Sequence, residues 1–129
     1  AIIAIGIFNI QHLYYRKDRL KKPKTTLKCI EIKKNMGWCD DIKFSKKYNK
    51  LIKIKEDISY EKLYRRDFKY DLLIPIKYNF KGSIIGKGSC IFIHLTKNYQ
   101  PTAGCIALRK KDFLILLKLV NKKTKIKIY

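Results

Sequence analysis

Short runs of β-branched and aromatic residues, separated by turn-forming residues, recur along this chain and constrain its fold more than any other feature. Such runs are typical of strands, because branched and aromatic side chains pack well on a pleated surface. The runs that we interpret as strands are Ile2–Asn9, Leu27–Ile32, Asp71–Ile76, Ser89–Leu95, Cys105–Leu108 and Lys125–Tyr129. The sequence therefore predicts a mainly β fold.

Two segments depart from the strand pattern. Lys110–Val120 is rich in Leu, opens on Lys-Lys-Asp and is followed by Asn121, which predicts one short buried helix. Between Met36 and Tyr60 the chain is rich in Lys and Asn, so we expect a long surface loop with little regular structure. The 129 residues suit one domain, which usually has ~100–200 residues. We therefore expect a single domain over residues 1–129, folded as a mixed β-sandwich.

The chain is strongly basic, because 31 Lys and Arg residues oppose 10 Asp and Glu residues. The resulting net charge of +21 predicts attraction to polyanions such as nucleic acid, anionic lipid or acidic cell-wall polymer. One alternative function is a small basic nucleic-acid-binding module, in which Tyr14, Tyr15, Tyr64 and Phe68 stack on bases. No recognised nucleic-acid motif is present, so we expect no specific nucleic-acid partner.

The start of the chain is apolar, but it lacks the basic region and the cleavage-site pattern of a signal peptide. We interpret it as a strand, and we expect the first strands of the domain to precede residue 1. No run reaches the ~18 apolar residues of a membrane-spanning helix, so no transmembrane segment is expected. The cysteines form no CxxC pair and have no His-x3-5-His partner, so we expect neither a metal nor a cofactor.

The candidate catalytic side chains lie together within residues 89–108. An alternating strand leads to His94, a polar loop follows, and Thr-Ala-Gly-Cys opens a second strand at Cys105. A free thiol is only a few per cent thiolate at neutral pH, and a neighbouring imidazole can take its proton. Gly104 permits a tight turn, so the backbone N–H groups from Ala103 to Cys105 are the expected donors to an oxyanion.

The stretch from Gly88 to Leu108 resembles the catalytic signature of the L,D-transpeptidase (YkuD-type) domain, in the branch whose members read GS-AIF-LH and PTAGC-VAL. Other motifs of this branch have counterparts in order along the chain. These counterparts are Gly6-Ile7-Phe8, Tyr15-Arg16-Lys17-Asp18-Arg19, Gly37-Trp38-Cys39-Asp40-Asp41, Glu61 with Tyr70-Asp71, and Asp112 before the Leu-rich segment. The resemblance implies a YkuD-like mixed β-sandwich with one short C-terminal helix.

This resemblance implies a monomeric cysteine acyltransferase that acts on peptidoglycan stem peptides in the bacterial cell envelope or periplasm. Cys105 would attack the carbonyl between the diamino acid at stem position three and D-alanine at position four. His94 would act first as base and then as acid. The resulting thioester would pass to an amine of another stem peptide, which forms a cross-link, or to water, which trims the stem.

The residues that bind the substrate are less clearly marked. The family usually has Ser-x-Gly-Cys and an Arg two residues after the nucleophile, whereas this chain reads Thr-Ala-Gly-Cys-Ile-Ala. Arg16, Arg19 and Arg109 are therefore candidates for contacting a substrate carboxylate. Thr102 and Trp38 are further substrate-binding candidates, although a large aromatic side chain in a long loop more often anchors that loop, which is the interpretation we favour for Trp38.

Other Cys-His enzymes fit the sequence less well. Sortases also place His before Cys, but their Thr-Leu-x-Thr-Cys element and downstream Arg are missing here. Papain-like and NlpC-type peptidases place Cys before His. The order of the two residues therefore favours the L,D-transpeptidase interpretation.

Overall fold

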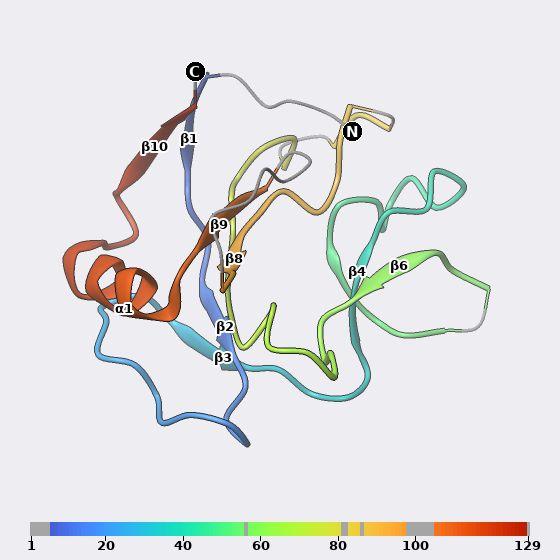
Figure 1. The fold of residues 1–129 in the computed structure, drawn as a ribbon. Helices are drawn as coiled ribbons and strands as arrows, with labels where there is room; N and C mark the ends of the chain where they lie inside the picture. Colours follow the sequence, from blue (N-terminus) through green and yellow to red (C-terminus); the bar gives the residue numbers. More distant parts are fainter. Residues whose placement is uncertain (1–5, 56, 81–82, 86, 98–104, 129) are drawn as a thin grey trace.

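The computed structural model describes residues 6–55, 57–80, 83–85, 87–97 and 105–128. Within these ranges the chain forms ten strands, arranged in three sheets, and one helix (Figure 1). The prediction of a mainly β fold with one short C-terminal helix is therefore confirmed. No helix in this part of the chain is long and apolar enough to cross a membrane.

Five strands form a central sheet in the order β3-β2-β7-β8-β9. Their bounds are β2 Leu13–Tyr15, β3 Cys29–Glu31, β7 Leu72–Pro75, β8 Phe92–Leu95 and β9 Ile106–Leu108. The pairs β2–β3 and β8–β9 are parallel, whereas β2–β7 and β7–β8 are antiparallel. The central sheet is therefore mixed, with a parallel pair at each edge.

Two smaller sheets and the helix flank the central sheet. Their bounds are β4 Met36–Cys39, β5 Leu51–Lys53, β6 Tyr60–Lys62, β1 Gly6–Asn9, β10 Lys125–Ile128 and α1 Lys110–Leu119. Strand β4 lies between β5 and β6, and β1 pairs antiparallel with β10. Figure 1 shows α1, β1 and β10 on one side of the central strands, and β4 and β6 on the opposite side.

Alternation of side chains along the central strands divides the apolar residues between two cores. Along β8, Ile93 belongs to one core and Phe92 to the other. The first, which we call the helix-side core, includes Phe113 and Leu117 of α1. The second, which we call the tryptophan core, includes Trp38 of β4. Each face of the central sheet is therefore covered by apolar side chains.

The segment from Met36 to Tyr60 is not the loop that its composition indicates. It contains β4 and β5 and ends on the first residue of β6, so the prediction of little regular structure is wrong. Strand β5 is an edge strand, and its two outer residues, Leu51 and Lys53, are exposed. An edge strand with exposed side chains has the composition of a loop, and for this reason the composition predicted a loop here.

The other strand predictions agree with the structure apart from their ends. The six predicted runs contain β1, β3, β7, β8, β9 and β10, and the four in the middle of the chain are each shorter than their run. Residues 2–5 of the first run and residue 129 of the last lie outside the described residues. Strand β2 is absent from the predictions because its three residues are all buried and so give no alternating pattern.

The helix lies where the sequence predicts it, but only one of its faces is buried. Phe113 and Leu117 are four residues apart and are fully buried, whereas Ile115 and Leu119 are 50% and 75% exposed. Asp112 lies in the first turn, where a carboxylate interacts favourably with the helix dipole. The expectation of a buried helix is therefore correct for one face only.

Trp38 anchors β4 in the tryptophan core. Its ring packs edge-on against Phe92 with ring centroids 5.4 Å apart, and its Nε1 donates a hydrogen bond of 2.9 Å to Asn49 Oδ1. Asn49 has a φ of +57°, a left-handed conformation that asparagine tolerates, and its Nδ2 donates to the carbonyls of Tyr78 and Asn79. One buried side chain therefore joins the β4–β5 hairpin to the segment that follows β7.

We expect Asn49→Ala to lower the free energy of unfolding by about 3 kcal/mol, because the Trp38 N–H and two carbonyls lose their partner. The left-handed backbone also disfavours alanine. Urea unfolding monitored by the fluorescence of the single Trp measures the change. Asn35→Ala is the control on an exposed residue and should change stability by less than about 0.5 kcal/mol. Equal effects of the two substitutions would contradict the anchor.

Candidate active site

His94 lies on β8 and Cys105 lies immediately before β9, with both side chains on one face of the central sheet. In the parallel pair, His94 lies opposite Ala107. Cys105 precedes Ala107 by two residues, so its side chain points to the same face as that of His94. Cys105 packs against the tryptophan core, and the His94 ring contacts Tyr70 of that core. The two side chains thus come from β8 and from the residue before β9, and both lie at the tryptophan core.

The Cys105 thiol is half-buried and donates a hydrogen bond of 3.2 Å to the carbonyl oxygen of Cys90. Cys90 has a φ of +60°, a left-handed conformation just before β8. Burial raises the pKa of Cys105, although a backbone hydrogen bond from Phe92 opposes this shift. Burial also raises the pKa of the neighbouring Cys90 to about 12. Both thiols are therefore protonated at neutral pH.

His94 is buried, and its Nδ1 lies 3.0 Å from the carbonyl oxygen of Leu95. A carbonyl can only accept a hydrogen bond, so Nδ1 carries the proton and Nε2 of the neutral ring keeps its lone pair. Burial lowers the pKa of His94 from its ordinary value, and this effect outweighs the hydrogen bond to Leu95, which raises it. The imidazole is therefore a neutral base at neutral pH, with the acceptor nitrogen fixed.

Tyr70 forms a wall beside His94 and connects it to a carboxylate. The two rings meet edge-on with centroids 5.9 Å apart, and the Tyr70 hydroxyl donates a hydrogen bond of 2.9 Å to Glu61 Oε1. Arg65 Nη1 lies 3.3 Å from the same oxygen. Burial raises the pKa of Tyr70, so its hydroxyl remains a donor. The sequence marks Glu61 and Tyr70 only as parts of a motif, because their contact joins β6 to the turn before β7 and depends on tertiary structure.

Three charges act on the His94 imidazole besides its burial. The cations of Lys69 and Arg65 lower the pKa of His94, and the Glu61 carboxylate raises it. Arg65 is held by Asp67 through contacts of 2.9 and 2.7 Å to the two carboxylate oxygens. Arg65 also contacts Glu61, so the cations and carboxylates beside the site partly offset one another.

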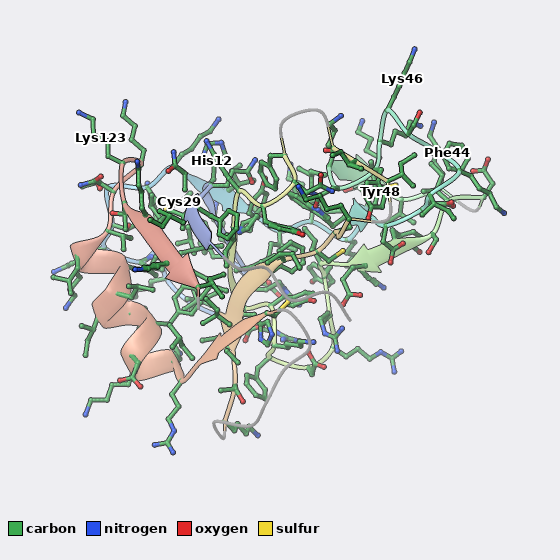
Figure 2. The ribbon with its side chains drawn as sticks, turned by 90° about the horizontal axis from the view of Figure 1, so that it is seen from above. His12, Cys29, Phe44, Lys46, Tyr48 and Lys123 are labelled. Carbon is green, nitrogen blue, oxygen red and sulfur yellow. The ribbon has the colours of Figure 1, made fainter. Side chains whose placement is uncertain are left out.

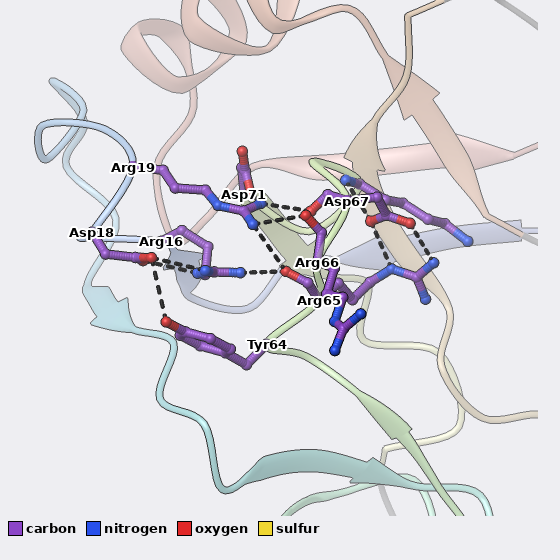
Figure 3. A network of polar contacts seen from close by, with 9 residues as sticks. Arg16, Asp18, Arg19, Tyr64, Arg65, Arg66, Asp67 and Asp71 are labelled. Atoms are coloured by element: carbon purple, nitrogen blue, oxygen red, sulfur yellow. Dashed lines mark hydrogen bonds and ion pairs between the residues drawn. The ribbon is translucent and has the colours of Figure 1, made fainter.

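Arg16 and Arg19 hold the turn that precedes Tyr70, instead of reaching the site (Figure 3). Arg16 contacts both carboxylate oxygens of Asp18 at 2.8 Å and donates to the carbonyl of Arg65. Arg19 donates to the carbonyls of residues 65–67 and to the carboxylate of Asp71. These contacts give both side chains a structural role within the protein, and the substrate-binding role expected of them stays a prediction.

The remaining expected residues do not add to the described site. Trp38 is only 1% exposed, so it is an anchor and cannot serve as the substrate contact that was also considered. Arg109 is exposed at the junction of β9 and α1. The expected residues outside the described part of the chain are Thr102, Ala103 and Gly104. Of the expected oxyanion donors, the structure therefore describes Cys105.

Two further features of the described residues are their metal-binding side chains and their aromatic rings. No group of three or more His, Cys, Asp or Glu side chains that could hold a metal occurs among the described residues. Tyr14 and Tyr15 are buried, and the Arg16 guanidinium covers the Tyr64 ring at 3.6 Å from its centroid, so these rings are not open to nucleic-acid bases. Figure 2 shows Lys46 and Lys123 projecting from opposite ends of the molecule.

Alkylation of Cys105 by iodoacetamide tests the protonation state of the thiol. Because burial raises its pKa above the ordinary 9.0, we expect the rate to rise with a midpoint above that pH. Mass spectrometry of the peptide that contains Cys105 measures the rate, and the urea-unfolded chain is the control. A plateau that extends below neutral pH would contradict this expectation, because it would indicate a preformed thiolate–imidazolium pair.

Comparison with known proteins identifies the family of this chain. The family model described as YkuD, the L,D-transpeptidase catalytic domain, matches residues 4–128. Neither the search of curated proteins nor the search of solved structures found a match. The matched range covers nearly the whole chain and includes both His94 and Cys105. The resemblance noted in the sequence is thereby confirmed, and the chain belongs to the L,D-transpeptidase (YkuD) catalytic domain family.

Proposed function

We propose that this chain acts on peptidoglycan stem tetrapeptides through an acyl-enzyme on Cys105, with His94 as the acid–base group. The observation that carries this proposal is the shared face of β8 and β9. It is consistent with a protonated thiol just before β9 and a neutral imidazole on β8 acting together, in a family whose members act on peptidoglycan. A thiol and a base within one environment can perform nucleophilic acyl transfer without a cofactor.

The first half-reaction forms the thioester. His94 Nε2 takes the proton from Cys105 Sγ as the sulfur attacks the carbonyl carbon between the diamino acid and D-alanine. The carbonyl oxygen gains negative charge, and we propose that backbone N–H groups of Ala103, Gly104 and Cys105 stabilise it. The C–N bond then breaks, His94 returns the proton to the leaving amine, and D-alanine departs.

The second half-reaction consumes the thioester. An amine of a second stem peptide, or water, attacks the thioester carbonyl while His94 takes a proton from the attacking group. The C–S bond breaks and the proton returns to the sulfur, which restores the thiol. The amine gives a cross-link and water gives a trimmed stem, so the same pair of residues supports both outcomes.

Glu61 and Tyr70 position and tune the base in this proposal. The Tyr70 ring limits rotation of the His94 ring, and the Glu61 carboxylate favours the imidazolium that forms during each half-reaction. The Leu95 carbonyl retains the Nδ1 proton, so Nε2 exchanges protons with the reacting groups. The described contacts therefore account for both the tautomer and the charge of the base.

We also propose an envelope or periplasmic location, a monomeric state and a single domain spanning residues 1–129. The family acts on the cell wall, which lies outside the cytoplasm. The basic surface would attract the carboxylates and phosphates of that material. Fractionation of cells that express the full-length protein tests the location, and recovery only from the cytosol would contradict it.

Intact-mass spectrometry after incubation with a tetrapeptide-stem muropeptide tests the acyl-enzyme. We expect a mass increase equal to the donor minus D-alanine, with release of free D-alanine. Cys105→Ala is expected to give neither product because it lacks the nucleophile, and Cys29→Ala, a partly exposed cysteine elsewhere in the fold, is the matched control that should retain both. An adduct that survives in Cys105→Ala would contradict the assignment.

The pH dependence of acylation tests the role of Glu61. His94 must be neutral to act as base, so the rate should rise with pH through a pKa below the ordinary 6.5. Glu61→Gln keeps a hydrogen-bond acceptor for Tyr70 but removes the charge that raises the pKa of His94. We therefore expect the acidic limb to move to lower pH in this variant. An unchanged limb, or a limb that moves to higher pH, would contradict the proposed electrostatic role.

A further inference from the structure

Lys69 is a cation beside the candidate site that forms no ion pair with a carboxylate among the described residues. The neighbouring arginines do form ion pairs: Arg65 with Asp67 and Glu61, Arg16 with Asp18, and Arg19 with Asp71. The Lys69 side chain is partly exposed, so its ammonium is open to a ligand. A cation that forms no ion pair and lies next to an acyl-transfer site can attract an anionic part of the substrate.

The position of Lys69 relative to His94 is fixed by its backbone and its neighbours. Its carbonyl accepts a hydrogen bond of 3.0 Å from the N–H of Leu95, the residue after His94, and its N–H donates to Asp67 Oδ1. The ammonium lies 5.4 Å from the centroid of the Tyr70 ring, and this ring also meets the His94 ring edge-on. Lys69 and the candidate base therefore both lie beside the Tyr70 ring.

The charge of Lys69 is felt at both candidate catalytic groups. Its positive charge acts to lower the pKa of His94 and that of Cys105. A tetrapeptide donor carries a terminal carboxylate one residue beyond the scissile carbonyl. When position three is a diamino acid with a side-chain carboxylate, a second anion lies on the other side of that carbonyl. Either carboxylate can pair with an ammonium beside the Tyr70 ring.

We propose that Lys69 is a specificity-determining residue that binds a carboxylate of the donor peptide. This inference rests on the proposed function. Lys69 would take the place of the arginine that the family usually carries after the nucleophile. Lys69 takes no part in proton transfer in this assignment. Its ammonium holds the anion so that the adjacent carbonyl lies against Cys105, and a peptide without that carboxylate loses the contact.

The test compares acylation of Cys105 by three synthetic stem tetrapeptides. The first contains diaminopimelate at position three and ends in free D-alanine, the second ends in D-alaninamide, and the third has lysine in place of diaminopimelate. Each kcat/KM is measured for the unaltered protein, for Lys69→Met, which removes the charge, and for Lys69→Arg, which keeps it. Lys62→Met, an exposed lysine of β6, is the matched control.

We expect Lys69→Met to lower kcat/KM for the first donor by about 10- to 100-fold, as for loss of a charge-assisted hydrogen bond. The loss should disappear with the amidated donor if the terminal carboxylate binds Lys69, or with the lysine donor if the side-chain carboxylate does. Lys69→Arg and Lys62→Met should retain the preference. Changes in the pKa of His94 affect all three donors equally, so they leave these ratios unchanged.

A loss of the same size with all three donors would overturn the assignment, because Lys69 would then act on the fold or on the dyad and not on a carboxylate. An unchanged kcat/KM for the first donor would overturn it as well. Absence of any acyl-enzyme in the unaltered protein with all three donors would overturn the proposed function and this inference together. Rapid acylation without donor discrimination would overturn the inference alone.

Discussion

The parallel pairing of β8 with β9 is the constraint on which the candidate site depends. Its register sets His94 opposite Ala107 and so turns Cys105 to the same face of the sheet as the imidazole. A shift of one residue in this pairing would turn Cys105 to the helix-side core and separate the two groups. The two cores hold the register, because Phe92 is buried in one and Ile93 in the other. Packing on both faces of one sheet therefore positions the chemistry.

Burial then decides the charge state of the pair. Desolvation raises the pKa of Cys105 and lowers that of His94, so the resting site contains a neutral thiol and a neutral imidazole. Such a pair makes little thiolate until a substrate is present, which limits unwanted reactions of the nucleophile. The charges of Glu61 and Lys69 oppose each other at His94. In this account the first favours the imidazolium formed during turnover and the second binds the anionic donor.

The sequence predicts the fold class, the helix and six of the strands, because their alternation or apolar periodicity is strong. It misassigns the segment from Met36 to Tyr60, where an edge strand exposes most of its side chains and has the composition of a loop. His94 and Cys105 stand out because their order and spacing form a recognisable motif. The structural role of Arg16 and the position of Lys69 cannot be predicted from the sequence. The contact of Arg16, just after β2, with the carbonyl of Arg65 and the hydrogen bond of Lys69 to Asp67 both depend on tertiary structure.

Single-turnover acylation of Cys105 as a function of pH, compared between the unaltered chain and His94→Gln, tests the central claim most directly. The account predicts a rate in the unaltered chain that rises through one titration below pH 6.5. It predicts that His94→Gln is slower by about 10²- to 10⁴-fold and lacks this titration, because the base has been removed. An acylation rate and pH profile that His94→Gln leaves unchanged would contradict the claim that the two residues act as a pair.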